Sequence, residues 1–131
     1  MPPRPARRDL WFIDREELAW AAGFVDGEGS FYKQKTASRK KPNKPWRPRF
    51  EIGQVDSYAL YRLQAVLPFG NVVNGPYDNK KHATARARPV YCYCVSGFED
   101  VQALVALLWT WLGPVKRSQA ASLLKEYLNG S

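Results

Sequence analysis

Cysteine is scarce in this sequence, and its placement does not suggest a disulfide framework. Cys92 and Cys94 are the only cysteines among the 131 residues, and they stand two positions apart in a strand-like run. In an extended strand their α-carbons would lie roughly 7 Å apart, at the outer limit for a disulfide. A single C-x-C pair is also poor zinc spacing without other ligands nearby. We therefore expect a reducing intracellular compartment, either the cytoplasm or an organelle matrix.

Long apolar runs and targeting segments are also missing from the sequence. The most apolar stretch, residues 101–112, is far shorter than the roughly 20 residues of a membrane span. The first residues are basic but lack the apolar core of a secretory signal. We expect no membrane partner, and we interpret residues 1–13 as a flexible basic arm in front of a single domain over residues 14–131.

Acidic residues are outnumbered by basic ones. The chain has 20 Lys and Arg against 12 Asp and Glu, a net charge of +8 and a pI near 9.7. Such a balance favours a polyanionic partner, and nucleic acid before a membrane. The same excess could serve solubility alone, so charge does not decide between the two.

Residues 18–31, LAWAAGFVDGEGSF, hold the most informative pattern. Read as a helix, the stretch places Ala19, Ala22, Gly23 and Asp26 on one face with almost no side chains, where a second helix could approach closely. Two glycines then break the helix and flank an acid, Glu28. Taken separately, a small helix face is usually a packing device and such an acid is usually part of a helix end.

Taken together, these features resemble the LAGLIDADG motif of homing endonucleases. Residues 21–29, AAGFVDGEG, correspond to the nine residues of this motif. Ala21 replaces the leading Leu and Glu28 replaces the last Asp, so an apolar residue and a carboxylate are kept. The string GFVDGEGS is similar to that of single-motif, homodimeric, intron-encoded members. The resemblance implies an α+β fold of order αββαββα, with a curved four-stranded antiparallel sheet backed by helices.

The periodicity along the chain predicts the same order of elements. Two capping boxes, Asp14 with Glu17 and Ser96 with Glu99, and a cap at Asp56 predict helix starts. No sequence period of 20–50 residues suggests a repeat protein. The expected elements are a helix from Asp14 through the motif, strands 30–36 and 47–55, a helix of about ten residues after Asp56, a possible short strand 71–77, a strand 84–95, and helices 98–112 and 116–128.

One face of the predicted strands is polar and basic, which is typical of a nucleic-acid surface. Arg and Gln read guanine and adenine in the major groove, whereas Lys in the Pro-rich loop 37–48 would meet phosphates. The alternative is a solvated face, since antiparallel sheets often leave one side wet. The candidate DNA-binding residues are Tyr32, Gln34, Thr36, Ser38, Lys40, Lys41, Lys44, Arg47, Arg49, Glu51, Thr84, Arg86 and Arg88.

The resemblance also implies a catalytic site. In the family an acid from each of two motifs binds divalent metal between the scissile phosphates, so Glu28, with the Gly27 carbonyl beside it, is the expected ligand of Mg²⁺ or another divalent cation. Gln54 and Lys116 occupy the places of residues that support the hydrolytic water. The alternative for both is an ordinary surface role.

Two further expectations follow from the motif. Asp26 should serve hydrogen bonding at the helix end rather than metal binding. An Arg of the family pattern is Tyr58 here, and Arg62 or Arg117 could replace it.

A second acidic motif is missing, so one chain supplies one acid and half of a DNA surface. Cutting both strands would then need a homodimer through the face of Ala19, Ala22, Gly23 and Asp26, and a near-palindromic site. Two other readings stay open. One is a non-cleaving nucleic-acid binder on this fold, such as an intron splicing maturase or a repressor. The other is a basic α+β interaction domain, which leaves the glycine-flanked acid unexplained.

Overall fold

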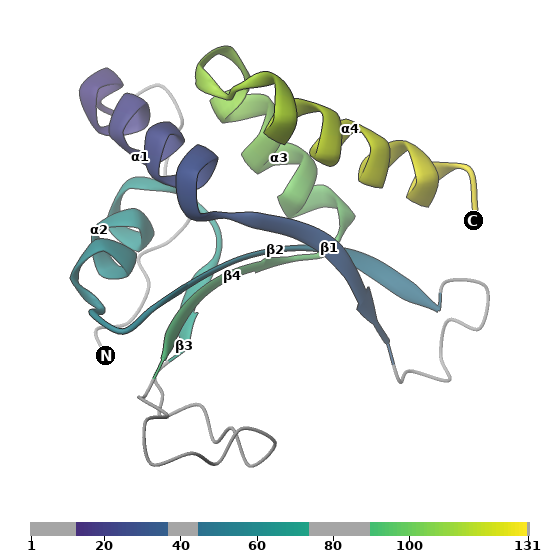
Figure 1. Cartoon of the computed structure of the whole chain (residues 1–131), viewed down its shortest axis with the longest axis horizontal. Coiled ribbons are helices and arrows are strands. Elements are labelled where there is room, and N and C mark those ends of the chain that lie inside the picture. Colours follow the sequence, from purple (N-terminus) through teal and green to yellow (C-terminus); the bar gives the residue numbers. More distant parts are fainter. Residues whose placement is uncertain (1–12, 37–44, 74–89, 131) are drawn as a thin grey trace.

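The computed structural model describes residues 13–36, 45–73 and 90–130. Within these ranges four α-helices, one short 3₁₀ helix and four strands follow one another (Figure 1). The elements are α1 Arg15–Glu28, β1 Ser30–Lys35, β2 Trp46–Gln54, α2 Tyr58–Val66, β3 Asn71–Val73, β4 Tyr91–Ser96, α3 Phe98–Leu108, η3 Trp109–Trp111 and α4 Pro114–Leu128.

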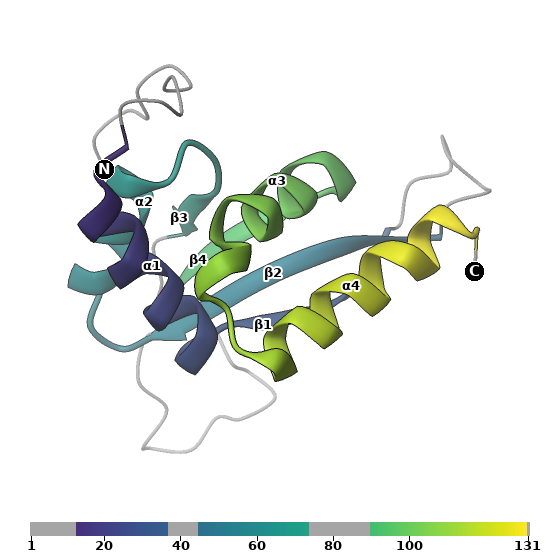
Figure 2. The same ribbon diagram turned by 90° about the horizontal axis from the view of Figure 1, so that it is seen from above.

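The strands form one antiparallel sheet in the order β1-β2-β4-β3. The sheet is curved, and the helices all lie on its convex side (Figure 1). Seen from above, α4 runs along β1 and β2 while α1 and α3 lie beside it (Figure 2). The concave face carries none of the described helices. This arrangement confirms the predicted α+β fold and its element order.

Alternation along the two central strands separates a core face from a concave face. Phe50 and Ile52 of β2, with Tyr93 and Val95 of β4, are buried beneath the helices. Their neighbours in sequence therefore point to the concave face, because successive side chains of a strand alternate. The strand pattern thus places the polar residues of β2 on a surface that no described helix covers.

The first helix begins at Asp14, whose carboxylate accepts a hydrogen bond from the Glu16 N–H at 2.9 Å. The predicted N-cap is confirmed, but the predicted capping box with Glu17 is wrong. The Glu17 carboxylate instead accepts hydrogen bonds from the Arg62 guanidinium at 2.7 and 3.1 Å. A carboxylate that pairs with a guanidinium on a neighbouring helix is not available to the backbone of its own helix.

The second predicted capping box, Ser96 with Glu99, is also wrong. The helix begins after Gly97, whose φ of 94° is readily adopted only by glycine. Ser96 belongs to β4, and its hydroxyl oxygen accepts a hydrogen bond from Arg49 at 3.0 Å. Ser96 therefore hydrogen-bonds within the sheet and does not cap the helix.

The two predicted helices 98–112 and 116–128 are observed, but the first ends earlier and the second starts earlier than predicted. α3 ends at Leu108, and η3 tightens the chain before α4 starts with Pro114 at its first turn. Proline suits that position because its missing N–H would have no partner in the helix.

In the described ranges no helix is long and apolar enough to cross a membrane. Most of the arm at 1–13 and the predicted strand portions 74–77 and 84–89 lie outside the described residues.

Candidate functional site

Glu28 is the last residue of α1, and its side chain is exposed. The helix stops there because Gly29 turns straight into β1. A β-carbon at Gly29 would lie 2.3 Å from the Phe50 ring and 2.7 Å from the Val25 carbonyl oxygen. Only glycine lets the chain pass this close to the core. Glu28 is therefore held at the junction between α1 and β1.

An acid at this end of a helix is placed against the local electrostatics. The carboxyl end of a helix carries a partial negative charge, and an exposed anion there is destabilising by about 0.3–1 kcal/mol. The last turn of α1 contains no basic residue to offset it. The Gln54 amide donates a long hydrogen bond to this carboxylate, with Nε2 3.5 Å from Glu28 Oε2. Such a carboxylate favours a cation from solution.

Lys116 lies in the first turn of α4 and lines a groove of about 490 Å³ between β1 and α4. Gly29 and Ser30, the two residues after Glu28, line the same groove. The two helices are tied together beside it, because Asp26 Oδ1 accepts a hydrogen bond from the Gly113 N–H at 2.8 Å. The structure thus brings Glu28 and Gln54 together and places Lys116 next to the segment that follows Glu28.

The concave face carries five of the predicted polar side chains in one pair and one group of three. Gln34 of β1 is opposite Arg47 of β2, and the Arg47 Nε donates to Gln34 Oε1 at 2.7 Å. The Tyr32 hydroxyl donates to Glu51 at 2.6 Å, and the Arg49 Nε donates to the same carboxylate at 3.1 Å. These five residues therefore form two neighbouring hydrogen-bonded groups across β1 and β2. Thr36 lies just after β1.

The hydrogen bonds around Glu51 shift the pKa of Tyr32 and of Glu51 itself. Burial and the hydrogen bond to Glu51 raise the pKa of Tyr32 to about 12. Burial alone would raise the pKa of Glu51, but hydrogen bonds from Tyr32, Cys92 and Arg49 bring it below its ordinary value. Glu51 therefore stays ionised and Tyr32 stays protonated around neutral pH.

Seven of the predicted DNA-binding residues lie outside the described residues, so the structure says nothing of them. They are Ser38, Lys40, Lys41, Lys44, Thr84, Arg86 and Arg88.

Comparison with known proteins decides the family. The sequence profile described as LAGLIDADG endonuclease matches residues 21–108, well over half of the chain. The chain belongs to the LAGLIDADG endonuclease family. The prediction made from residues 21–29 is thereby confirmed.

Solved structures of homing endonucleases have a similar fold. The homing endonuclease I-CvuI, in complex with the I-CreI target, is 26% identical with a TM-score of 0.68, over 89% of this chain and 69% of that one. The homing endonuclease I-TnaI is 22% identical with a TM-score of 0.63, over 85% of this chain and 71% of that one. The group I intron-encoded I-CeuI, complexed with DNA, is 18% identical with a TM-score of 0.59, over 89% and 57%. A search of curated proteins gives no match.

The outward face of the LAGLIDADG helix differs from the predicted one. Ala22 is fully buried in the core of its own chain and does not lie on an open face, whereas Asp26 is half-buried and accepts a hydrogen bond from the Gly113 N–H. Ala19 and Gly23 are exposed as predicted, and Gly27 is the third exposed residue of the stripe. Residues 19, 23 and 27 are four positions apart, so they lie on one face of the helix.

The two arginines considered as replacements at Tyr58 are engaged elsewhere. Arg62 pairs with Glu17 and stacks on the Trp20 ring, 3.9 Å from its centroid. Arg117 donates to the carbonyl oxygens of Trp109 and Thr110 at 2.9 and 3.1 Å. In the described structure neither guanidinium is directed to Glu28.

Proposed function

We propose that this LAGLIDADG protein is a site-specific, metal-dependent endonuclease that cuts double-stranded DNA as a homodimer on a long, near-palindromic site. The observation that carries the proposal is the exposed Glu28 carboxylate at the end of α1, beside a polar concave face. A basic chain with Arg, Gln and Tyr side chains on one face suits a duplex, whose phosphates attract it and whose base edges these side chains can read.

The concave face would contact the major groove. Arg47 and Gln34 supply the donors and acceptors that distinguish guanine and adenine, and their mutual hydrogen bond fixes their positions before binding. β2 spans nine residues, or roughly 30 Å at strand rise, which corresponds to about nine base pairs of B-form DNA. Two copies related by a two-fold axis would therefore read about twice that length.

The residues at Glu28 fit a hard divalent cation such as Mg²⁺. The Glu28 carboxylate and the Gly27 carbonyl are oxygen donors, and Mg²⁺ is usually bound by one or two carboxylates together with waters and substrate phosphates. A bound ion would supply Lewis-acid activation of water and neutralise charge on the phosphate. A sparse protein donor set is therefore what this ion requires.

Two other side chains would act on water and phosphate directly. The Gln54 amide, next to Glu28, can orient a water molecule by donating and accepting hydrogen bonds. The Lys116 ammonium group adds a positive charge beside the path of the scissile phosphate. Both roles stay proposals that follow from the resemblance and from the placement of these residues.

The homodimer is supported by a glycine that the chain itself does not need. Gly23 lies in the middle of α1, where glycine is destabilising by about 1 kcal/mol relative to alanine. A β-carbon there would meet no described atom of the chain within 4 Å. A close approach by the same helix of a second copy would account for the glycine, and it would bring two Glu28 carboxylates toward one axis.

The test is selection of a target from a randomised duplex library. The full-length protein would be incubated with the library and Mg²⁺, and the cut ends would be sequenced. We expect cuts in both strands at a near-palindromic sequence of about 18–20 base pairs, because β2 of each copy spans about nine base pairs. Enrichment of bound but uncut duplexes would instead support a binder that does not cleave. The reducing compartment predicted from the sequence stays a prediction.

A further inference from the structure

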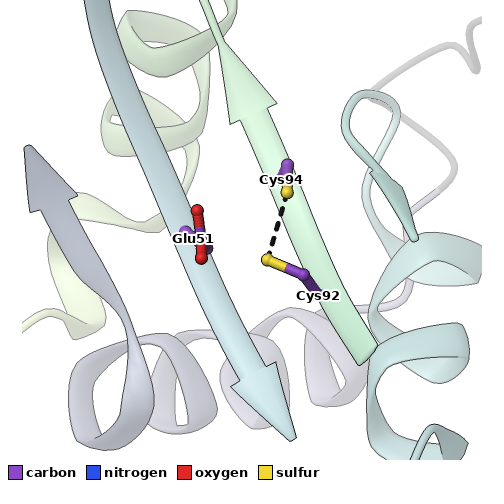
Figure 3. Close-up of side chains that lie close together, drawn as sticks. All are labelled: Glu51, Cys92 and Cys94. Carbon is purple, nitrogen blue, oxygen red and sulfur yellow. Dashed lines mark hydrogen bonds between the residues drawn. The ribbon is translucent and has the colours of Figure 1, made fainter. Parts of the chain in front are cut away.

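Two cysteines and a glutamate form a second cluster that the proposed cleavage site does not use. Glu51 of β2 and Cys92 and Cys94 of β4 each offer one ligand atom, and these atoms all lie within 4.8 Å of one another. The three side chains stand together on adjacent strands (Figure 3). The register explains this, because Cys94 is opposite Glu51 and Cys92 is two residues away on the same face.

We propose that this cluster is a binding site for a thiophilic divalent cation of the Zn²⁺ type, separate from the cation at Glu28. Two sulfurs and one carboxylate oxygen are a donor set that Zn²⁺ accepts, with a fourth position left for water or another ligand. The soft thiolates select against Mg²⁺ and Ca²⁺, which take oxygen ligands. The two sites would thus hold different classes of metal.

The distance between the two sulfurs fits a shared metal better than a disulfide. The Cys92 and Cys94 Sγ atoms are 3.2 Å apart. Two sulfurs bound tetrahedrally to one Zn²⁺ at about 2.3 Å lie about 3.8 Å apart, which needs only a small opening. A disulfide would need about 2.05 Å between the sulfurs, and the α-carbons of an extended strand are poorly spaced for it. β4 pairs with strands on both sides at this point, which keeps it extended.

A cation already occupies part of this site. The Arg49 guanidinium donates to Cys94 Sγ at 2.8 Å and to Glu51 Oε2 at 3.1 Å. Its position shows that the cluster attracts positive charge. A divalent ion on the same sulfur and the same carboxylate would compete with Arg49, because two cations cannot share these ligands without strong repulsion. Metal binding would therefore release Arg49 from its partners on the concave face.

The burial of the cluster is consistent with a protected metal site. Cys92 is 1% exposed and Cys94 is 9% exposed, whereas the Glu51 side chain is 28% exposed. An ion could enter from the side of Glu51 and then be shielded by the sheet. The described residues show no other group of three or more acidic, cysteine or histidine side chains that meets the same distance limit.

The test is titration of the full-length, fully reduced protein with Co²⁺, in the absence of DNA and of chelators. Because the chain has no other cysteine, any sulfur-to-cobalt charge-transfer absorption must come from this pair. We expect absorption that saturates at one ion per chain and disappears when Zn²⁺ is added, since Zn²⁺ binds such sites more tightly than Co²⁺. A prior thiol assay giving two free thiols per chain confirms that the protein is reduced.

Variants separate a metal site from two cysteines that are merely packed. Losing an outer-shell partner of a metal already costs roughly 10- to 100-fold in affinity. Cys92→Ser, Cys94→Ser and Glu51→Gln each remove a proposed direct ligand, so each should weaken Co²⁺ binding by at least about that much. Arg49→Gln removes the competing cation and should tighten binding severalfold, a result that a structural role alone would not produce. Glu99→Gln, an exposed acid on α3, is the matched control and should bind normally.

The proposal is overturned if the reduced protein gives no thiolate absorption with Co²⁺, or if Glu51→Gln and Glu99→Gln bind equally well. It is also overturned if air or a disulfide reagent oxidises the two cysteines to a disulfide equally fast with and without Zn²⁺, because a bound ion should protect both thiols. Far-ultraviolet circular dichroism of each variant excludes loss of binding through unfolding. Because no DNA is present, none of these outcomes bears on the cleavage proposed at Glu28.

Discussion

Asp26 Oδ1 accepts a hydrogen bond from the Gly113 N–H at 2.8 Å, and this bond joins the end of α1 to the start of α4. Glu28 lies two residues beyond Asp26, and Lys116 lies three residues beyond Gly113. This partly buried contact therefore helps to fix the placement of the proposed metal ligand relative to the proposed catalytic lysine. Asp26, the first acid of the motif, thus has a structural role, as the sequence predicts.

We expect Asp26→Ala to lower both stability and cleavage. Losing a hydrogen bond to a charged acceptor costs about 1.5–3 kcal/mol, and the two helix ends would no longer be held in register. Asp26→Asn keeps an oxygen acceptor and should restore most of the stability and the cleavage. Urea denaturation and cleavage of the selected target measure the two effects.

Asp14→Ala is the matched control at the other end of the same helix. It removes the N-cap bond to Glu16 and should cost about 1 kcal/mol, with the cleavage rate unchanged. Equal losses of cleavage in Asp14→Ala and Asp26→Ala at matched folded fractions would mean that the Asp26 contact does not position the site.

The fold and the family could be predicted because each depends on local patterns. The motif at 21–29 is continuous in sequence, and the alternation of polar and apolar residues in β2 assigns its faces directly. The outward side of α1 could not be predicted in the same way. Residues 22 and 23 are adjacent and both small, yet they point about 100° apart on a helix. Which of them faces out is decided by the helices packed around it.

The two wrong capping boxes share a physical cause. Ser96 and Glu17 are suitable capping residues, but each side chain is taken by an arginine that is distant in sequence. The cluster of Glu51 with the two cysteines was missed for a related reason. A C-x-C pair is poor zinc spacing alone, and the third donor comes from a neighbouring strand that only the register brings close.

Gly23→Leu should convert the protein from a dimer to a monomer. The side chain would enter the proposed contact between two copies of α1 and hold them apart, and its β-carbon would meet no described atom of its own chain within 4 Å. Light scattering should give twice the 15.0 kDa chain mass for the wild type and one chain mass for the variant. Ala106→Leu, at an exposed position of α3, should leave the mass unchanged. An unaltered dimer in Gly23→Leu would remove α1 from the interface.

Arg47→Ala should relax sequence preference at one base pair in each half-site. An arginine that reads a base edge contributes about 1–3 kcal/mol of discrimination, so specificity should fall about 5- to 150-fold at that position. Lys33→Ala is the control, because Lys33 points to the helix side of the sheet and pairs with Glu126. Cleavage profiles on a library of single-base variants measure both. If Lys33→Ala changed the sequence preference and Arg47→Ala did not, DNA would bind the helix side of the sheet and not the concave face.

Glu51 should make the fold sensitive to acid. Its pKa in the folded chain is below the ordinary value of 4.5, so its contribution to stability is present above pH 4.5 and is lost as pH falls through the folded value. We therefore expect wild type and Glu51→Gln to differ most in urea midpoint above about pH 5, and the gap to shrink on acidification. A gap that stayed constant or widened down to pH 3 would contradict the hydrogen-bonded arrangement at Glu51.

Glu28→Gln tests the central claim most directly. The change keeps the shape of the side chain and removes the charge, so it should abolish detectable cleavage of the selected target in Mg²⁺. Target binding, measured in Ca²⁺, should stay within a few-fold of wild type, because the concave face is untouched. The variant should also be as stable or up to about 1 kcal/mol more stable, since the acid opposes the helix dipole. A Glu28→Gln protein that still cuts at a rate close to wild type would contradict the assignment of the active site.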